Sequence, residues 1–181
     1  MLKYAFIANS ENMTPEDYHW EYDNDEMKFR FYATNNMDAT KKCAQKLADE
    51  GFEYLDLCGD FDAAKAKEVE NAAMGRISVA YAKYSKDEEE KFESLQKMDD
   101  YGLIVMAPGL EPGAVKIKKM PSPEFNTTIA LVGDDEASIA AARDFASDGI
   151  DFIELCGYFD DTKTKNIIRA IDGKTPVGSC G

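Results

Sequence analysis

One eight-residue sequence motif, which we call the repeated phrase, occurs twice in the chain. This repeat constrains the fold more than any other feature of the sequence. The first copy reads LDLCGDFD at 55–62 and the second reads IELCGYFD at 153–160. The copies lie 98 residues apart, and Gly51 and Gly149 keep the same spacing. A fixed spacing of this kind indicates an internal duplication. The sequence therefore predicts two homologous halves with one candidate site in each.

The length and composition agree with two small halves that depend on each other. A chain of 181 residues with 44% hydrophobic residues can form one large domain or two small ones. Each repeat has about 80 residues, which is small for an independent core. We therefore expect an intramolecular pseudo-dimer with pseudo-two-fold symmetry, and further homo-oligomers stay open. The predicted parts are a first repeat at 1–84, a charged and helical linker at 85–100, and a second repeat at 101–181.

The charge of the chain argues against a nucleic-acid partner. The formal net charge is -14, and the densest basic cluster is the short run 116–119. A polyanion would be repelled over most of such a surface. We expect a soluble, acidic protein without a nucleic-acid partner.

The cysteines and the N-terminus indicate a cytoplasmic protein without a metal centre or cofactor. The four cysteines form no Cys-x-x-Cys pair, and His19 is the only histidine, so we expect no structural zinc. Cys43 lies among alanines of a predicted helix and is expected in the core. No signal peptide and no membrane-spanning run are visible, so we expect no membrane partner. Free thiols suit a reducing compartment.

Hydrophobic periodicity predicts the pattern β-β-α-β-α-β in each half, which indicates an α/β fold with mainly parallel sheets. The segments 9–26 and 107–123 are rich in charge, Pro or Gly and are predicted to be irregular. In the first half we expect strands at 4–8, 27–33, 52–58 and 76–81 and helices at 37–50 and 63–74. In the second half we expect strands at 101–105, 126–132, 150–156 and 174–179 and helices at 135–148 and 162–171.

The repeated phrase places a carboxylate and a thiol at the end of a strand, directly before a helix. Alternation in a strand puts Asp56 and Cys58 on one face, and likewise Glu154 and Cys156. These four residues are the candidate catalytic groups. Ligands bind at the carboxyl ends of strands in open α/β sheets, and helix N-termini favour anions. The candidate ligand-binding residues are Gly59, Phe61, Asp62, Gly157, Phe159 and Asp160.

Three functions remain open from the residues alone. The first is a small-molecule binding or regulatory protein that takes an anion or a carboxylate at each turn. The second is a cysteine-dependent isomerase or lyase acting on a small carboxylic acid. The third is a non-catalytic assembly subunit that uses the acidic loop around His19 as a contact surface. Purely structural roles also account for the residues of the phrase, because cysteine often fills cores and Asp often caps helices.

The phrase resembles the signature Glu-Leu-Cys-Gly-Gly-Phe of an uncharacterised, mainly bacterial family known only as a domain of unknown function. The sequence ELCGYF at 154–159 is the closer match, and DLCGDF at 56–61 is the more divergent one. Both copies lack the second glycine of the signature. The segment PSPEF at 121–125 is also similar to that family. The resemblance implies a fused pair of family domains and no particular activity.

Overall fold

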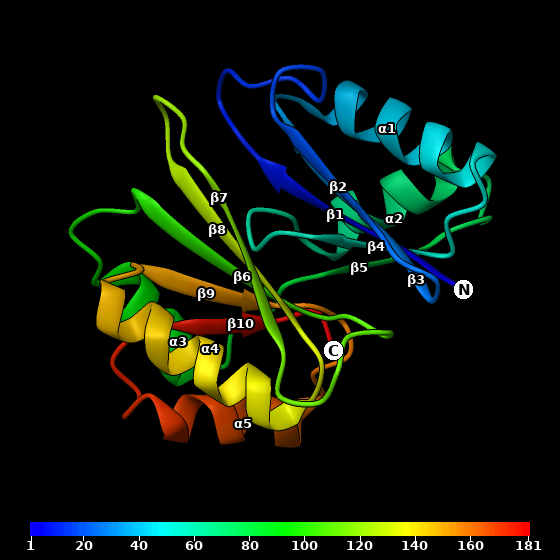
Figure 1. Cartoon of the computed structure of the whole chain (residues 1–181). Helices are drawn as coiled ribbons and strands as arrows, with labels where there is room; N and C mark the ends of the chain where they lie inside the picture. Colours follow the sequence, from blue (N-terminus) through cyan, green and yellow to red (C-terminus); the bar gives the residue numbers. More distant parts are fainter. The chain divides into compact units, whose positions relative to one another are not determined.

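The computed structural model describes all residues from 1 to 181, and the chain divides into two compact units, Met1–Tyr81 and Ala82–Gly181. Each unit contains a five-stranded, mainly parallel sheet together with helices (Figure 1). The predicted α/β fold with two similar halves is therefore confirmed. None of the helices combines the length and the apolar character needed to cross a bilayer.

The sheet of the first unit has the strand order β2-β3-β1-β4-β5, and only the β2–β3 pairing is antiparallel. Both helices that follow the parallel strands cover the same face of this sheet (Figure 1). The elements are β1 (Leu2–Asn9), β2 (His19–Asp23), β3 (Met27–Thr34), α1 (Met37–Asp49), β4 (Tyr54–Leu57), α2 (Ala63–Ala72) and β5 (Ser78–Tyr81).

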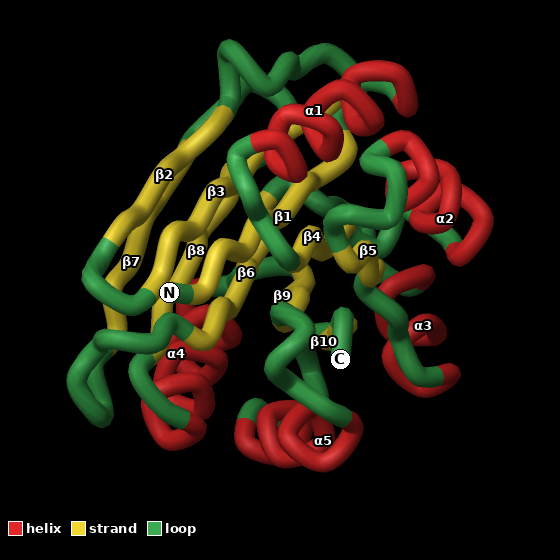
Figure 2. Tube along the Cα trace, turned by 90° about the vertical axis from the view of Figure 1, so that its right-hand side faces the viewer, coloured by secondary structure: helices red, strands yellow, loops and turns green.

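The second unit repeats this arrangement, with the order β10-β9-β6-β8-β7 and one antiparallel pairing, between β7 and β8. Two of its helices, α4 and α5, lie together along one face of the sheet (Figure 2). The elements are α3 (Lys86–Glu93), β6 (Asp100–Met106), β7 (Val115–Met120), β8 (Asn126–Val132), α4 (Asp135–Asp148), β9 (Phe152–Leu155), α5 (Asp161–Ala170) and β10 (Val177–Ser179).

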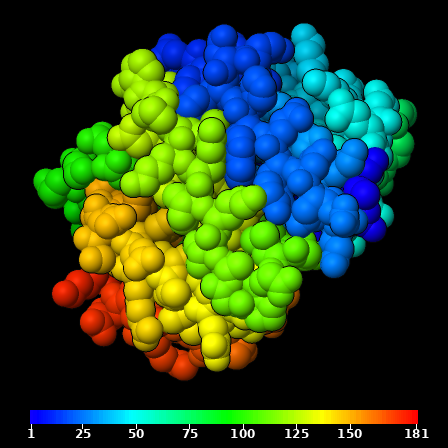
Figure 3. Space-filling view, in the orientation of Figure 1, coloured from blue at the N-terminus to red at the C-terminus, as the bar shows by residue number.

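The prediction that 9–26 and 107–123 are irregular was wrong, because each contains an antiparallel edge strand, β2 or β7. Along β2 the exposed His19, Glu21 and Asp23 alternate with half-buried aromatic residues. This is the period-2 pattern of a strand with one wet face. Most side chains of β7 are exposed, and the strand lies at the surface drawn yellow-green in Figure 3, whereas Met120 at its end is buried.

The helices that follow β3 and β8 begin where the sequence predicts them. The side chain of Asn36 accepts a hydrogen bond from the Ala39 N–H, and that of Asp134 accepts one from the Ala137 N–H, each at 2.8 Å. Gly149 ends α4 with a φ of 80°, a left-handed conformation that glycine adopts without steric cost. Both helix starts are therefore fixed by local capping.

The segment predicted as a charged linker contains α3, which packs within the second unit. Lys83 and Ser179 exchange two backbone hydrogen bonds of 2.9 Å on the outer side of β10. Glu88 is buried and accepts a hydrogen bond of 2.9 Å from the Val177 N–H. These contacts cover the edge of β10, which would otherwise offer unpaired N–H and C=O groups to another strand.

Candidate functional site

The two carboxylates of the repeated phrase are buried and hydrogen bonded to tyrosines. Asp56 is 4% exposed and accepts a hydrogen bond of 2.8 Å from the Tyr4 hydroxyl. Glu154 is 1% exposed and accepts bonds of 2.9 Å from Tyr101 and 3.0 Å from Tyr84. Tyr4 and Tyr101 occupy equivalent places in the first strand of each unit. The duplication therefore preserves a buried carboxylate–tyrosine pair.

The two thiols of the phrase are also buried, and each lies beside the end of a neighbouring strand. The Cys58 sulfur accepts a hydrogen bond of 3.1 Å from the Asn9 N–H. The Cys156 sulfur accepts one of 3.4 Å from the Met106 N–H. A hydrogen bond of this kind ties the turn after β4 or β9 to the end of β1 or β6. Both thiols thus contribute to holding the turn in place.

The helix N-termini after the phrase are already occupied by side-chain carboxylates. Asp62 accepts a hydrogen bond of 2.8 Å from the Lys65 N–H, and Asp160 accepts one of 2.9 Å from the Lys163 N–H. The backbone N–H of Lys163, and then its positive charge, hold the pKa of Asp160 below its ordinary value. A bound anion would have to share these N–H groups with a carboxylate of the protein.

The remaining residues of the two turns divide into exposed glycines and buried aromatic rings. Gly59 and Gly157 lie at the surface, and Phe61 and Phe159 are buried. Each ring anchors its turn to the core of its own unit. As ligand contacts, the residues of the two turns stay predictions.

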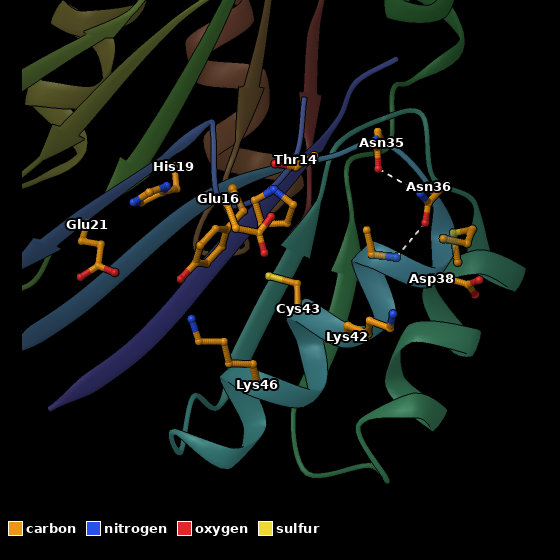
Figure 4. A pocket seen from close by; sticks show the side chains of 14 residues that line it. Thr14, Glu16, His19, Glu21, Asn35, Asn36, Asp38, Lys42, Cys43 and Lys46 are labelled. Atoms are coloured by element: carbon orange, nitrogen blue, oxygen red, sulfur yellow. Dashed lines mark hydrogen bonds between the residues drawn. The ribbon is translucent and has the colours of Figure 1, made fainter. Parts of the chain in front are cut away.

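A hollow lies in the first unit, between α1, the β2–β3 hairpin and the loop that precedes β2 (Figure 4). Its volume is about 1100 Å³, slightly above the range of roughly 300–1,000 Å³ that is typical of small-molecule sites. We call it the α1 pocket. It is lined by Thr14, Pro15, Glu16, His19, Glu21, Tyr32, Asn35, Asn36, Met37, Asp38, Ala39, Lys42, Cys43 and Lys46.

Tyr32 supplies a polar group at the buried wall of the α1 pocket. The residue is 7% exposed, and its ring stacks on His19 with the ring centroids 6.1 Å apart. Its hydroxyl makes no hydrogen bond with another protein group, and its oxygen is solvent-accessible, because no fully buried side-chain N or O atom lacks a partner. Burial raises the pKa of Tyr32 to about 12, so the hydroxyl stays protonated and can donate at neutral pH.

Cys43 lines the same wall as a neutral thiol. It is 7% exposed, and burial raises its pKa to about 12 although the charge of Lys46 acts in the opposite direction. Glu16 and Glu50 add to the rise through their negative charges. The thiolate is the nucleophilic form, so Cys43 is not an activated nucleophile at neutral pH. Sequence reasoning placed it in the core and missed that it also lines a pocket.

The charged side chains of the α1 pocket are unevenly paired. Lys42 and Lys46 form no salt bridge, whereas Lys41 on the same helix pairs with Glu68 at 2.9 Å outside the pocket. Figure 4 shows Lys46 reaching from α1 toward the opening that His19 and Glu16 also border. The ammonium groups of Lys42 and Lys46 are therefore available to pair with a ligand, in a protein that is otherwise strongly acidic.

The second unit offers an internal reference, because strand register and helix caps align the two halves. The pair His19–Tyr32 on β2 and β3 corresponds to the pair Ile117–Ala130 on β7 and β8. At the helix positions equivalent to Lys42, Cys43 and Lys46, the second half has Ala140, Ala141 and Asp144. The tyrosine, the thiol and the two lysines of the α1 pocket thus have no counterparts of the same kind in the second half.

The loop before β7 packs closely against the start of α4 in the second unit. A Cβ atom built on Gly133 would lie 2.2 Å from the Glu111 carbonyl oxygen, so only glycine permits this approach. The Gly113 N–H donates a hydrogen bond of 2.7 Å to Asp134, the N-cap residue of α4. The first half has Asn35 at the position of Gly133, and this side chain lines the pocket. The two halves therefore differ in loop packing as well as in polar groups.

Comparison with known proteins gives a family and no activity. No curated protein matches the chain. One solved structure with overall likeness is an ABC transporter solute-binding protein from Conexibacter woesei, at 11% sequence identity and a TM-score of 0.30. That likeness covers 98% of this chain and 69% of the other, and at this TM-score it carries no argument.

The family match follows the duplication. The Family of unknown function (DUF6506) matches residues 2–97 and again residues 99–181. Each match covers one of the two five-stranded sheets with the two helices that follow its parallel strands, and the first match also includes α3. The chain therefore belongs to the DUF6506 family and carries two copies of its domain.

Proposed function

We propose that the chain is a small-molecule-binding protein and that its ligand lies in the α1 pocket of the first unit. The observation that carries this proposal is the Tyr32 hydroxyl, which has no protein partner although the residue as a whole is buried, and which is accessible from the hollow that it lines. A hydroxyl in this position is left to water in the free protein, and an acceptor group of a ligand can take the place of that water. A hydroxyl kept ready to donate into a cavity of ligand size supports a binding role.

The repeated turns support a ligand site less well than the α1 pocket does. Tyr4 donates to Asp56, Asn9 donates to Cys58, and Lys65 donates to Asp62. A ligand at the turn would have to break bonds that already exist. In the α1 pocket, a ligand adds bonds to Tyr32 and the nearby lysines without removing any.

A ligand screen with a pocket-filling variant tests the proposal. The wild-type protein is screened by thermal shift against a library of small metabolites, and each hit is measured by calorimetry on Lys42→Phe. Lys42 lines the pocket, so a bulky ring at this position takes up part of its space, and the affinity for a ligand bound there should fall at least about tenfold. Ala140→Phe adds the same ring at the equivalent exposed position of the second half and should leave affinity unchanged. An absence of hits, or hits that bind Lys42→Phe as well as wild type, would refute the proposal.

A further inference from the structure

We infer that the ligand of the α1 pocket is a small monocarboxylate, bound through Lys46 and the Tyr32 hydroxyl. This inference rests on the proposed function and adds the chemical class of the ligand. It follows from the balance of donors and acceptors that the pocket leaves unused.

Hydrogen-bond donors prevail among the available polar groups. The Tyr32 hydroxyl and the ammonium groups of Lys42 and Lys46 have no hydrogen-bond or ion-pair partner in the protein. The Asn35 side-chain oxygen accepts a bond of 2.9 Å from Asn36, so its amide hydrogens remain for another acceptor. A ligand that satisfies this set must present acceptors, and a carboxylate presents two oxygens.

The acidic neighbours limit the charge of the ligand. Glu16, Glu21 and Asp38 also line the pocket, and the whole chain has a net charge of -14. Arg30 lies 3.4 Å from Glu21 and compensates that one carboxylate. A phosphate ester or a polyanion would meet the remaining negative charge, which disfavours it against a single carboxylate.

The rest of the lining suits an apolar body next to the carboxylate. The Tyr32 ring, Pro15 and Met37 contribute apolar surface to the same hollow. Its volume of about 1100 Å³ accommodates a ring as well as the acid group. Figure 4 shows Lys46 and Cys43 on the same helix.

Matched acids and amides test the inference. The probes are benzoate against benzamide and nicotinate against nicotinamide, with inorganic phosphate at the same ionic strength, each titrated into wild-type protein by calorimetry. The acid of each pair should bind at least about tenfold more tightly than its amide, the effect of one charge-assisted hydrogen bond. Lys46→Gln should remove most of this difference, and Tyr32→Phe should weaken acid binding. Lys41→Gln makes the same charge change on the same helix outside the pocket and should bind the acids like wild type.

The outcomes separate the ligand class from the pocket itself. Amides that bind as tightly as acids, and that are lost in Lys42→Phe, would overturn the carboxylate class while the pocket stands. Three other results would also overturn the carboxylate class. They are phosphate binding as tight as benzoate binding, equal losses of acid affinity in Lys41→Gln and Lys46→Gln, and no binding of either acid at millimolar concentration. Acids that still bind Lys42→Phe with wild-type affinity would overturn the pocket.

Discussion

The Tyr4 hydroxyl lies 2.8 Å from Asp56 Oδ2, and the pair joins β1 to β4 within the first sheet. A hydrogen bond to a buried carboxylate contributes about 1.5–3 kcal/mol to stability. Tyr4→Phe should therefore lower the free energy of unfolding by about this amount. Urea denaturation followed by circular dichroism measures the loss.

The second half offers the matched control for this prediction. Glu154 accepts hydrogen bonds from both Tyr101 and Tyr84, so Tyr101→Phe leaves one of them in place. The loss in Tyr101→Phe should be smaller than the loss in a double variant that also carries Tyr84→Phe. An equal or larger loss would show that these hydrogen bonds do not set the stability of the two sheets.

The raised pKa of Cys43 predicts a loss of stability at alkaline pH. The folded thiol keeps its proton up to about pH 12, whereas the unfolded thiol releases it near the ordinary value of 9.0. The contribution of the Cys43 thiol to the free energy of unfolding is therefore fully present below pH 9, and it is lost as the pH rises toward 12. The loss should be on the order of 3–4 kcal/mol at the upper end, at about 1.4 kcal/mol for each pH unit.

Urea unfolding at a series of pH values measures this decline. Tyr32 adds to it above pH 10, because burial raises its pKa as well. Cys43→Ala should be less stable at neutral pH, since it leaves a small cavity, but should lose less stability between pH 9 and 10. An identical slope in wild type and variant across that interval would contradict the prediction.

All four cysteines should react slowly with iodoacetamide in the native protein. Cys43, Cys58, Cys156 and Cys180 are buried, so alkylation requires a local opening of the fold. Mass spectrometry should find little modification at neutral pH and four modified thiols in urea. Rapid labelling of Cys58 or Cys156 alone would instead favour the cysteine-dependent enzyme considered from the sequence.

Glu88 should stabilise the second unit through the edge of β10. Glu88→Ala removes the acceptor of the Val177 N–H and should cost about 1–3 kcal/mol. The exposed Glu90, which lies 3.9 Å from Lys86, gives the control variant Glu90→Ala, with an expected change below about 0.5 kcal/mol. Thermal unfolding compares the two, and size-exclusion chromatography shows whether the uncovered edge leads to association. Equal stabilities would show that the cover of β10 does not depend on Glu88.

Met74 is a site where one substitution should raise stability. It has a φ of 56°, a left-handed conformation that costs a residue with a Cβ about 1 kcal/mol, and its side chain is exposed. Met74→Gly should recover part of this cost, offset by the greater freedom of glycine in the unfolded chain. Met74→Asn avoids that offset and should raise the melting temperature by a few degrees. A lower melting temperature for Met74→Asn would contradict this account.

Local patterns in the sequence were sufficient to predict most of the helices and strands. Apolar runs, cap residues such as Asn36 and Asp134, and the end of α4 at Gly149 act within a few residues, so the sequence alone locates them. The strands β2 and β7 were missed because charge and proline around them hid their alternation. The signal that could have revealed β2 is the alternation of aromatic and charged residues, with Trp20 and Tyr22 on one face and Glu21 on the other.

The α1 pocket could not be predicted from local patterns. His19, Tyr32 and Cys43 come from three elements, and whether a loop fills the space between them depends on tertiary packing. A comparison of the two copies would have given a hint. The first half has titratable side chains at Tyr32 and Cys43 where the second half has Ala130 and Ala141. Divergence within a duplicated chain is therefore a useful signal for a site.

The close approach of Glu111 to Gly133 bears on how a duplicated chain evolves. In a homodimer encoded by one gene, every substitution is inherited by both subunits, so a loop that closes one site closes its twin. Once two copies share a polypeptide, each can mutate alone. Asn35 and Gly133 occupy equivalent positions and differ, so the two halves have changed independently at this point. The proposed site then occurs once per chain, and the stoichiometry of binding should be one ligand per molecule.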